Sequence, residues 1–123
     1  MSETLREKPN TAHPGSDETM SEPEREHCRA LIGSHSAGLR FVLAQGDETA
    51  IEQGVPPTIR YRCMAWSTLH RTAMSFAHYM SISEATDEEA KVAAHSLGNE
   101  LAELIIKQMP NSRNVVADIE ARQ

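Results

Sequence analysis

The sequence predicts an all-α protein: a three-helix antiparallel bundle with a disordered N-terminal tail and a short C-terminal helix. Three observations support this fold class. Apolar residues recur every three or four positions in three long segments, which is typical of amphipathic helices. No segment alternates apolar and polar residues as a strand would. Capping residues, glycines and prolines separate the three segments. At 123 residues the chain has room for one domain at most.

Residues 1–20 are predicted to form the disordered tail. Besides methionine, Leu5 is the one large apolar side chain in this segment, which also holds two prolines and shows no periodic pattern. Such a segment cannot bury enough apolar surface to offset the entropy lost on ordering.

The first helix is expected to begin after Ser21 and to end at Gly46. Ser21 and Glu24 have the spacing of a capping box, and Pro23 is tolerated because first-turn amides have no helical acceptor. The apolar positions recur at helical spacing, and they are Cys28, Leu31, Ile32, His35, Leu39, Val42 and Leu43. Residues 47–57 are predicted to connect this helix to the next, with Gly54 stopping any short helical turn.

The second helix is expected from Thr58 to about Met80, followed by a break at residues 81–83. Thr86 and Glu89 form a second capping-box pattern that opens the third helix. Pro110 is expected to end that helix. The organisation is therefore a tail over 1–20, a helical bundle over 21–110 and a C-terminal segment over 111–123. This last segment carries Val115, Val116 and Ile119 at helical spacing and could be a short docking helix, which needs a partner because isolated short helices fray.

The charge balance and the cysteines exclude several classes of protein. With 18 acidic and 12 basic residues, the net charge of −6 disfavours direct nucleic-acid binding. No apolar run approaches the roughly 18 residues that span a bilayer, so no membrane contact is expected and a cytoplasmic protein is predicted. Cys28 and Cys63 lie within helical apolar patterns and are predicted to be buried thiols, which is favoured over a disulfide.

No motif for catalysis or metal binding is present. Cys63 and His70 lie seven residues apart, hence on one helical face, but a structural zinc site needs four ligands, usually in paired short spacings. No nucleophile elbow and no glycine-rich phosphate loop occurs. We therefore expect no catalytic residue, no cofactor and no metal, and the histidines are interpreted as boundary residues among the helices.

The second helix carries apolar residues on two of its sides, which is more than a contact with a single neighbouring helix would cover. One line runs through Ile59, Cys63, Trp66, Ala73 and Met80, and a second runs through Tyr61, Met64, Ala65, Leu69, Phe76 and Tyr79. Two lines imply contacts on two sides, and a two-fold dimer is the commonest way to cover the second. The residues predicted to lie in the core or the dimer contact are Ile59, Cys63, Trp66, Leu69 and Phe76.

What stays exposed after dimerisation is predicted to bind a protein partner. These residues come from the later part of the first helix and from the C-terminal segment, and they are His35, Leu39, Arg40, Leu43, Val116, Ile119 and Arg122.

The run from Arg62 to His70 (RCMAWSTLH), followed by Glu100-Leu-Ala-Glu-Leu104, resembles short helical regulatory proteins of pseudomonads, the quorum-sensing antiactivators of the QslA type. The likeness extends over residues 21–123 in size, acidity and helix layout, without a diagnostic motif. It implies a helical homodimer that binds a LuxR-family transcription factor and blocks its dimerisation or DNA binding. No functional residue is carried over from it.

The predicted function is therefore non-catalytic transcription regulation: an antiactivator that binds and inhibits a transcription regulator through protein-protein contacts. An alternative is a helical oligomer that binds a small anionic ligand such as a cyclic nucleotide, gripped by Arg60, Arg62 and His70. A third hypothesis, an enzyme or metal protein using Cys63 and His70, has the least support.

Overall fold

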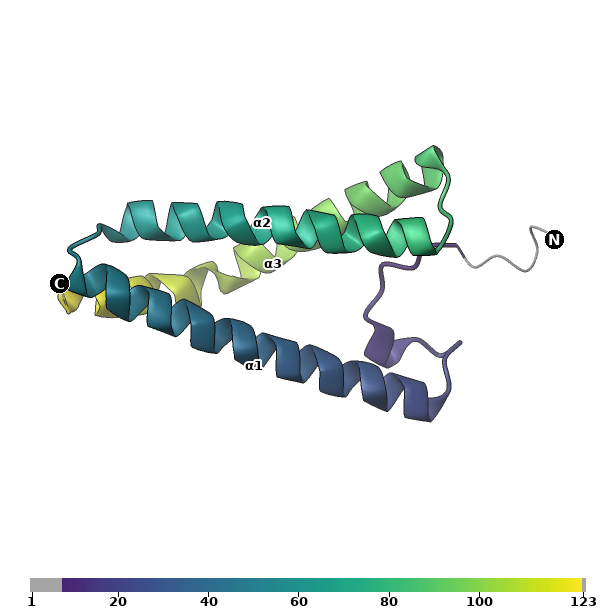
Figure 1. The fold of residues 1–123 in the computed structure, drawn as a ribbon, viewed down its shortest axis with the longest axis horizontal. Coiled ribbons are helices and arrows are strands. Elements are labelled where there is room, and N and C mark those ends of the chain that lie inside the picture. Colours follow the sequence, from purple (N-terminus) through teal and green to yellow (C-terminus); the bar gives the residue numbers. More distant parts are fainter. Residues whose placement is uncertain (1–7, 123) are drawn as a thin grey trace. The chain divides into compact units, whose positions relative to one another are not determined.

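The computed structural model describes residues 8–122, and within that range every regular element is a helix (Figure 1). A short 3-10 helix, η2 (Pro14–Ser16), precedes three long α-helices: α1 (Glu22–Glu52), α2 (Pro57–Ile82) and α3 (Asp87–Ala121). The predicted all-α class is confirmed. The chain divides into two compact units, residues 12–56 and residues 57–122 with residues 8–11, which are described in turn.

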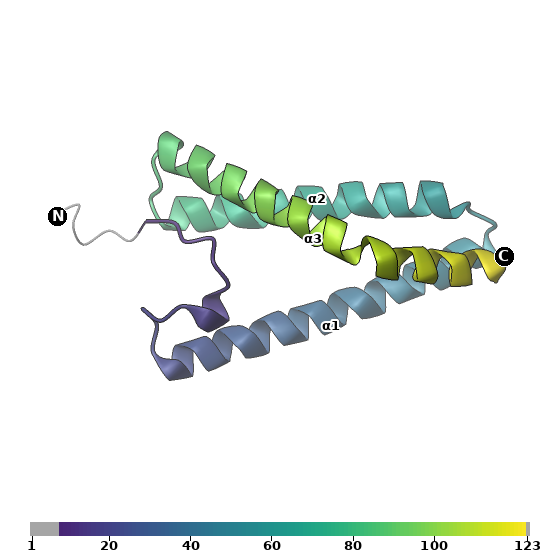
Figure 2. The ribbon, with the colours of Figure 1, turned by 180° about the vertical axis from the view of Figure 1, so that it is seen from behind.

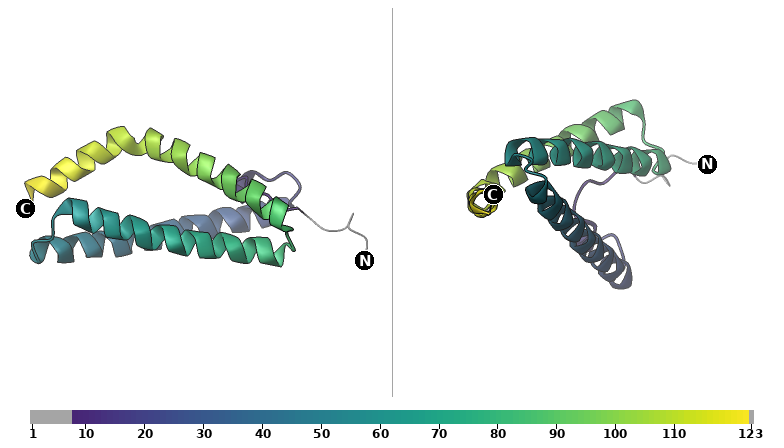
Figure 3. Two further views of the ribbon diagram at one scale, coloured as in Figure 1. Left: turned by 90° about the horizontal axis from the view of Figure 1, so that it is seen from above. Right: turned by 60° about the vertical axis from the view of Figure 1, so that its left-hand side comes forward.

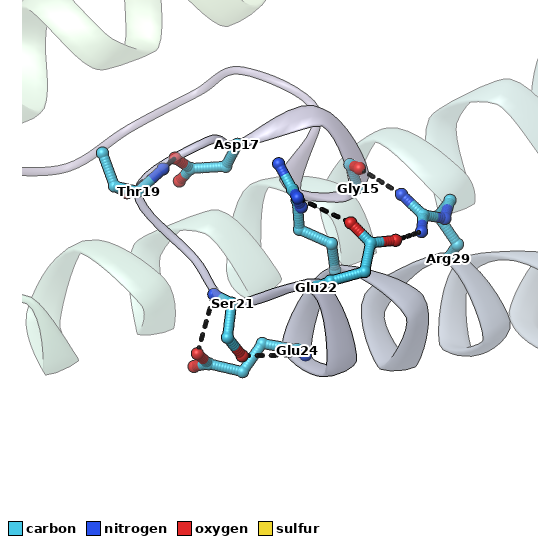
Figure 4. Close-up of polar contacts among 8 residues, drawn as sticks. Gly15, Asp17, Thr19, Ser21, Glu22, Glu24 and Arg29 are labelled. Atoms are coloured by element: carbon cyan, nitrogen blue, oxygen red, sulfur yellow. Dashed lines mark hydrogen bonds and ion pairs between the residues drawn. The ribbon is translucent and has the colours of Figure 1, made fainter.

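The first unit consists of η2 and α1, and their contact is made by α1's first two turns (Figure 4). Ser21 accepts a hydrogen bond from the Glu24 amide, and the Glu24 carboxylate accepts one from the Ser21 amide, so the predicted capping box is confirmed. Arg29 reaches back and donates to the carbonyl of Gly15. Gly15 is buried, and a Cβ there would lie 2.6 Å from the Arg29 Cγ. Because that distance is far inside van der Waals contact, only glycine fits against this arginine.

Ion pairs hold Arg29 in place. One oxygen of Glu22 lies 2.7 Å from the Arg29 guanidinium and the other lies 2.6 Å from that of Arg25 (Figure 4). The hydrogen bonds from Arg29 and then Arg25 lower the pKa of the Glu22 carboxyl below its ordinary value. The bond to Ser21 likewise lowers the pKa of Glu24, and bonds to Thr19 lower that of Asp17. An acidic first turn also suits the positive end of the helix dipole.

Part of the segment predicted to be a disordered tail therefore has defined structure. Residues 12–20 include η2, whose cap residue His13 accepts a hydrogen bond from the Gly15 amide. Residues 8–11 of the predicted tail are also described and belong to the second unit, whereas residues 1–7 lie outside the described residues.

The prediction that the first helix ends at Gly46 is wrong, because α1 continues to Glu52. A glycine inside a helix costs only about 1 kcal/mol, which the following turns can offset. α1 ends at Glu52, and two residues later Gly54 adopts left-handed backbone with φ of 71°. The Gly54 amide donates to Ile51 and the Val55 amide donates to Ala50, which is the complete Schellman pattern.

The second unit consists of α2, α3 and residues 8–11, and α2 contacts α3. α2 begins at Pro57, one residue before the expected start, in a position where a missing amide hydrogen costs nothing. It runs two residues past Met80, through Ile82. The capping box of Thr86 and Glu89, predicted for the third helix, is confirmed at the start of α3.

The prediction that Pro110 ends the third helix is wrong. Pro110 lies inside α3, which continues as a helix to Ala121, so residues 111–121 are the last turns of α3 and not a separate short helix. α3 is bent along its length (Figures 2 and 3), as a proline within a helix commonly causes. The turns beyond the proline bury Ile119 and half-bury Val116, which helps to offset the cost of the proline.

Little of the described chain is buried. Among residues 8–122 the buried apolar side chains are Ala93 and Ile119, and the buried charged residue is Arg60. Both cysteines are free, as expected, but the prediction that both are buried is wrong for Cys63, which is exposed, while Cys28 is half-buried. Large apolar side chains on all three helices are instead exposed.

Candidate protein-interaction surface

One side of α2 carries an exposed apolar stripe, which we call the α2 face and define as Ile59, Cys63, Trp66 and His70. These residues recur at intervals of three or four and therefore share one side of the helix. Ile59 is 56% exposed and Trp66 is 55% exposed. Ile59, Cys63 and Trp66, together with Arg62, line a shallow hollow of about 500 Å³. The sequence singled out three of these four residues, and Arg62 was named only as a candidate anion ligand.

The roughly opposite side of α2 is the one that packs. Arg60 is buried, and Tyr61 and Met64 are half-buried. The Arg60 guanidinium lies 5.3 Å from the centre of the Tyr61 ring, within the range of a cation–π contact. The two apolar lines predicted for this helix are not separated cleanly by burial, because Tyr61 and Met64 of the second line are half-buried while Leu69 of the same line is exposed.

Trp66 and His70 form a stacked pair on the α2 face. Their ring centres are 5.2 Å apart and their planes meet at 22°. The two residues are one helical turn apart, so the stack extends the aromatic surface along the helix. Tryptophan is the side chain most enriched at the energetic centres of protein interfaces. Trp66 is thus a candidate anchor.

The helix that carries the α2 face contains no acidic residue. From residue 53 to residue 83 the sequence contains no aspartate or glutamate, although the chain is acidic overall. Arg62 and Arg71 are both exposed within this stretch. A partner with carboxylates around an apolar strip would therefore complement this helix in charge.

α1 carries the largest exposed apolar surface of the first unit, and none of its residues is fully buried. Leu39 is 44% exposed and Leu43 is 38% exposed, while His35 and Arg40 are also exposed. The other large apolar side chains of α1 that remain exposed are Leu31, Ile32, Phe41 and Val42. Four of the seven residues predicted to bind a partner therefore lie together on one exposed helix.

The other three predicted partner residues differ among themselves. Arg122 is exposed at the C-cap of α3, Val116 is half-buried and Ile119 is only 3% exposed. Of the residues predicted for the core or dimer contact, Leu69 is 47% exposed and Phe76 is half-buried. Ile106 was not among the predicted site residues, although it is 72% exposed on α3. Ile106 directly follows Ile105 and so departs from the regular helical spacing, which could have indicated an exposed apolar side chain.

The residues that could hold an anion or a metal do not converge. Arg60 and Arg62 are two positions apart on α2, so they point to different sides, and Arg60 is buried over Tyr61 while Arg62 borders the exposed hollow. No three potential metal ligands lie close together among residues 8–122.

Comparison of the chain with protein-family models, with curated proteins and with solved structures finds no match. Within the part of the chain that the structure describes, no helix combines the length and the apolar character needed to span a bilayer.

Proposed function

We propose that this protein is a non-catalytic regulator: a helical homodimer that binds a transcription regulator and inhibits it through protein-protein contacts. The proposed architecture is an antiparallel three-helix bundle in each protomer. The target class is a LuxR-family transcription factor, which rests on the resemblance described above.

The observation that carries this proposal is the extent of exposed apolar surface. Trp66 on α2, Leu39 on α1 and Ile105 on α3 are each between 44% and 55% exposed. Single exposed apolar residues are ordinary on any protein, but stripes along whole helices are typical of surfaces that bind protein. A chain that buries so few apolar side chains gains stability by covering these stripes with another protein.

Within this proposal the α2 face and the exposed apolar stripe of α1 have different roles. The α2 face forms the contact between protomers, because it combines a tryptophan with a hollow beside it and lies away from the packed side of α2. The exposed residues of α1, which are His35, Leu39, Arg40 and Leu43, form the surface that contacts the regulator.

The direct test measures inhibition of a purified LuxR-family regulator. Binding of the regulator to its promoter DNA is followed by fluorescence anisotropy while this protein is added. We expect the wild-type chain to abolish DNA binding. We expect Leu39→Glu to restore it, because a carboxylate would have to be buried against the partner without a counter-charge.

The matched control is Ile82→Glu. Ile82 is 83% exposed near the end of α2, outside both stripes, so the same change there should leave inhibition intact. Circular dichroism should show equal helix content in both variants. DNA binding that persists in a large excess of the wild-type chain would contradict the proposal.

A further inference from the structure

Within the second unit, residues 8–11 lie against α2 and α3 near the connection between these two helices (Figure 2). The Tyr79 hydroxyl accepts a hydrogen bond from the Asn10 amide at 2.7 Å and donates one to the Asn10 carbonyl at 3.1 Å. The next residue, Thr11, shares a hydrogen bond with Ser96 of α3 at 3.2 Å between hydroxyl oxygens. Hydroxyls from two helices thus contact two consecutive residues of the segment.

The contact by Tyr79 indicates that extended main chain is recognised. The amide and carbonyl of one residue point the same way in extended backbone, as they do in the hydrogen-bonded pairs of an antiparallel sheet. One hydroxyl bonded to both groups of Asn10 therefore takes the place that a neighbouring strand would take. Peptides added to the edge of a sheet are held by the same main-chain groups.

A hollow of about 390 Å³ lies beside these hydrogen bonds. Pro9 and Thr11 are half-buried and line it together with Lys8, and its other lining residues come from α3: Glu88, Glu89, Val92, Ala93 and Ser96. Ala93 is 6% exposed, one of the few buried apolar residues of the described chain. Pro9 also fixes its own φ and biases Lys8 toward extended backbone, so less conformational freedom is lost on binding.

We propose that Tyr79, Ala93 and Ser96 form a binding site for an extended peptide, and that residues 8–11 of the same chain are its resident ligand. The segment competes from within the chain, where covalent linkage to the site raises its effective concentration. A second peptide can enter only by displacing it. The segment therefore acts as a built-in competitor for this site, independently of the proposed regulator-binding surface.

The first experiment measures hydrogen exchange of the Asn10 amide in the full-length chain. Tyr79→Phe removes the hydroxyl and keeps the ring, and Tyr79 is partly exposed, so the fold should persist. Each lost hydrogen bond is expected to accelerate exchange about fivefold. Tyr61→Phe, at the other end of α2, is the matched control and should leave the rate unchanged. Equal exchange in the wild type and Tyr79→Phe would overturn the proposal.

The second experiment adds a labelled synthetic peptide with the sequence of residues 5–14. Asn10→Pro in the full-length chain removes the amide donor of the resident segment and leaves the site intact. We expect this variant to bind the added peptide at least about fivefold more tightly than the wild type, and Asn10→Ala, which keeps the amide, to match the wild type. Equal affinities for the wild type and Asn10→Pro, or no binding to either, would overturn the proposal. Protection of Asn10 that rises with protein concentration would overturn it too, by assigning the site to the segment of a second copy.

Discussion

Two residues that follow helices adopt left-handed backbone, and only one of them is a glycine. Gly54 after α1 has φ of 71° and Glu84 after α2 has φ of 55°. Both sit in the same Schellman hydrogen-bond pattern, since the Glu84 amide donates to Ser81 and the Ala85 amide donates to Met80. A side chain in this conformation costs about 1 kcal/mol or more, whereas glycine adopts it freely. Glu84 therefore carries a cost that Gly54 avoids.

Exchanging these residue types should change stability in opposite directions. We expect Glu84→Gly to raise the free energy of unfolding by about 1 kcal/mol and Gly54→Ala to lower it by about the same amount. A Cβ at Gly54 meets no atom within 4 Å, so conformation and not crowding sets its cost. Urea unfolding followed by circular dichroism measures both. A loss of stability in Glu84→Gly would show that the Glu84 side chain contributes more than its backbone costs.

Acid should weaken the contact between Arg29 and Glu22. The folded pKa of Glu22 lies below its ordinary value of 4.5, because Arg29 and Arg25 bind the carboxylate. A lowered folded pKa gives stability that is present above the unfolded pKa and is lost as the pH falls through the folded one. We expect wild type to be more stable than Glu22→Gln near pH 6, and the difference to shrink as the pH falls below 4.5.

Thermal unfolding of both chains between pH 6 and pH 3 measures this difference, with Glu26→Gln, one turn further along α1, as the control for the loss of a glutamate charge. A gap between wild type and Glu22→Gln that stays constant over that range would show that the ion pairs contribute nothing to stability.

At the scale of the elements, the starts of the helices were predictable and their ends were not. Ser21 and Thr86 act through contacts three residues away, so local sequence contains the whole motif. Gly46 and Pro110 looked like stops, yet both lie inside helices. Their penalties are a few kcal/mol at most, and packing elsewhere on the helix can exceed them. For α3 that packing includes Ile119, whose burial depends on the folded chain and is not written in local spacing.

Replacing the internal proline should therefore stabilise α3. Pro110 has no amide hydrogen, so the Ile106 carbonyl lacks its usual helical donor, and the ring crowds that carbonyl. We expect Pro110→Ala to raise the free energy of unfolding by about 1–3 kcal/mol. Ser112→Ala, two residues further along α3, controls for helix propensity and should change it by a few tenths of a kcal/mol. No gain in Pro110→Ala would indicate that the bend itself is needed for packing.

At the scale of the whole molecule, the sequence predicted surplus apolar surface but could not assign it. Ile59, Cys63, Trp66, Leu69 and Phe76 were grouped as core or dimer residues, and the structure leaves the first four exposed. Ile119, grouped with the partner-binding residues, is buried instead. Periodicity locates an apolar side of a helix, but what covers that side depends on residues distant in sequence. The dimer and its geometry stay a prediction.

The dimer contact can be tested at Trp66. In a two-fold contact each residue occurs twice, so one substitution acts at two places. We expect the wild-type chain to sediment as a dimer and Trp66→Glu to raise the dimer dissociation constant at least tenfold, which is about 1.4 kcal/mol. Ile82→Glu, which adds the same charge outside the α2 face, should sediment as the wild type does. A monomeric wild-type chain at millimolar concentration would contradict the prediction.

The Trp66–His70 stack has a practical consequence. Trp66 is the one tryptophan in the sequence, and it is about half exposed on α2. The ultraviolet emission of the unlabelled protein therefore comes mainly from a single spot on its surface. Any molecule that shields this spot from water should shift the emission to shorter wavelength, so the chain contains its own optical probe for whatever docks there.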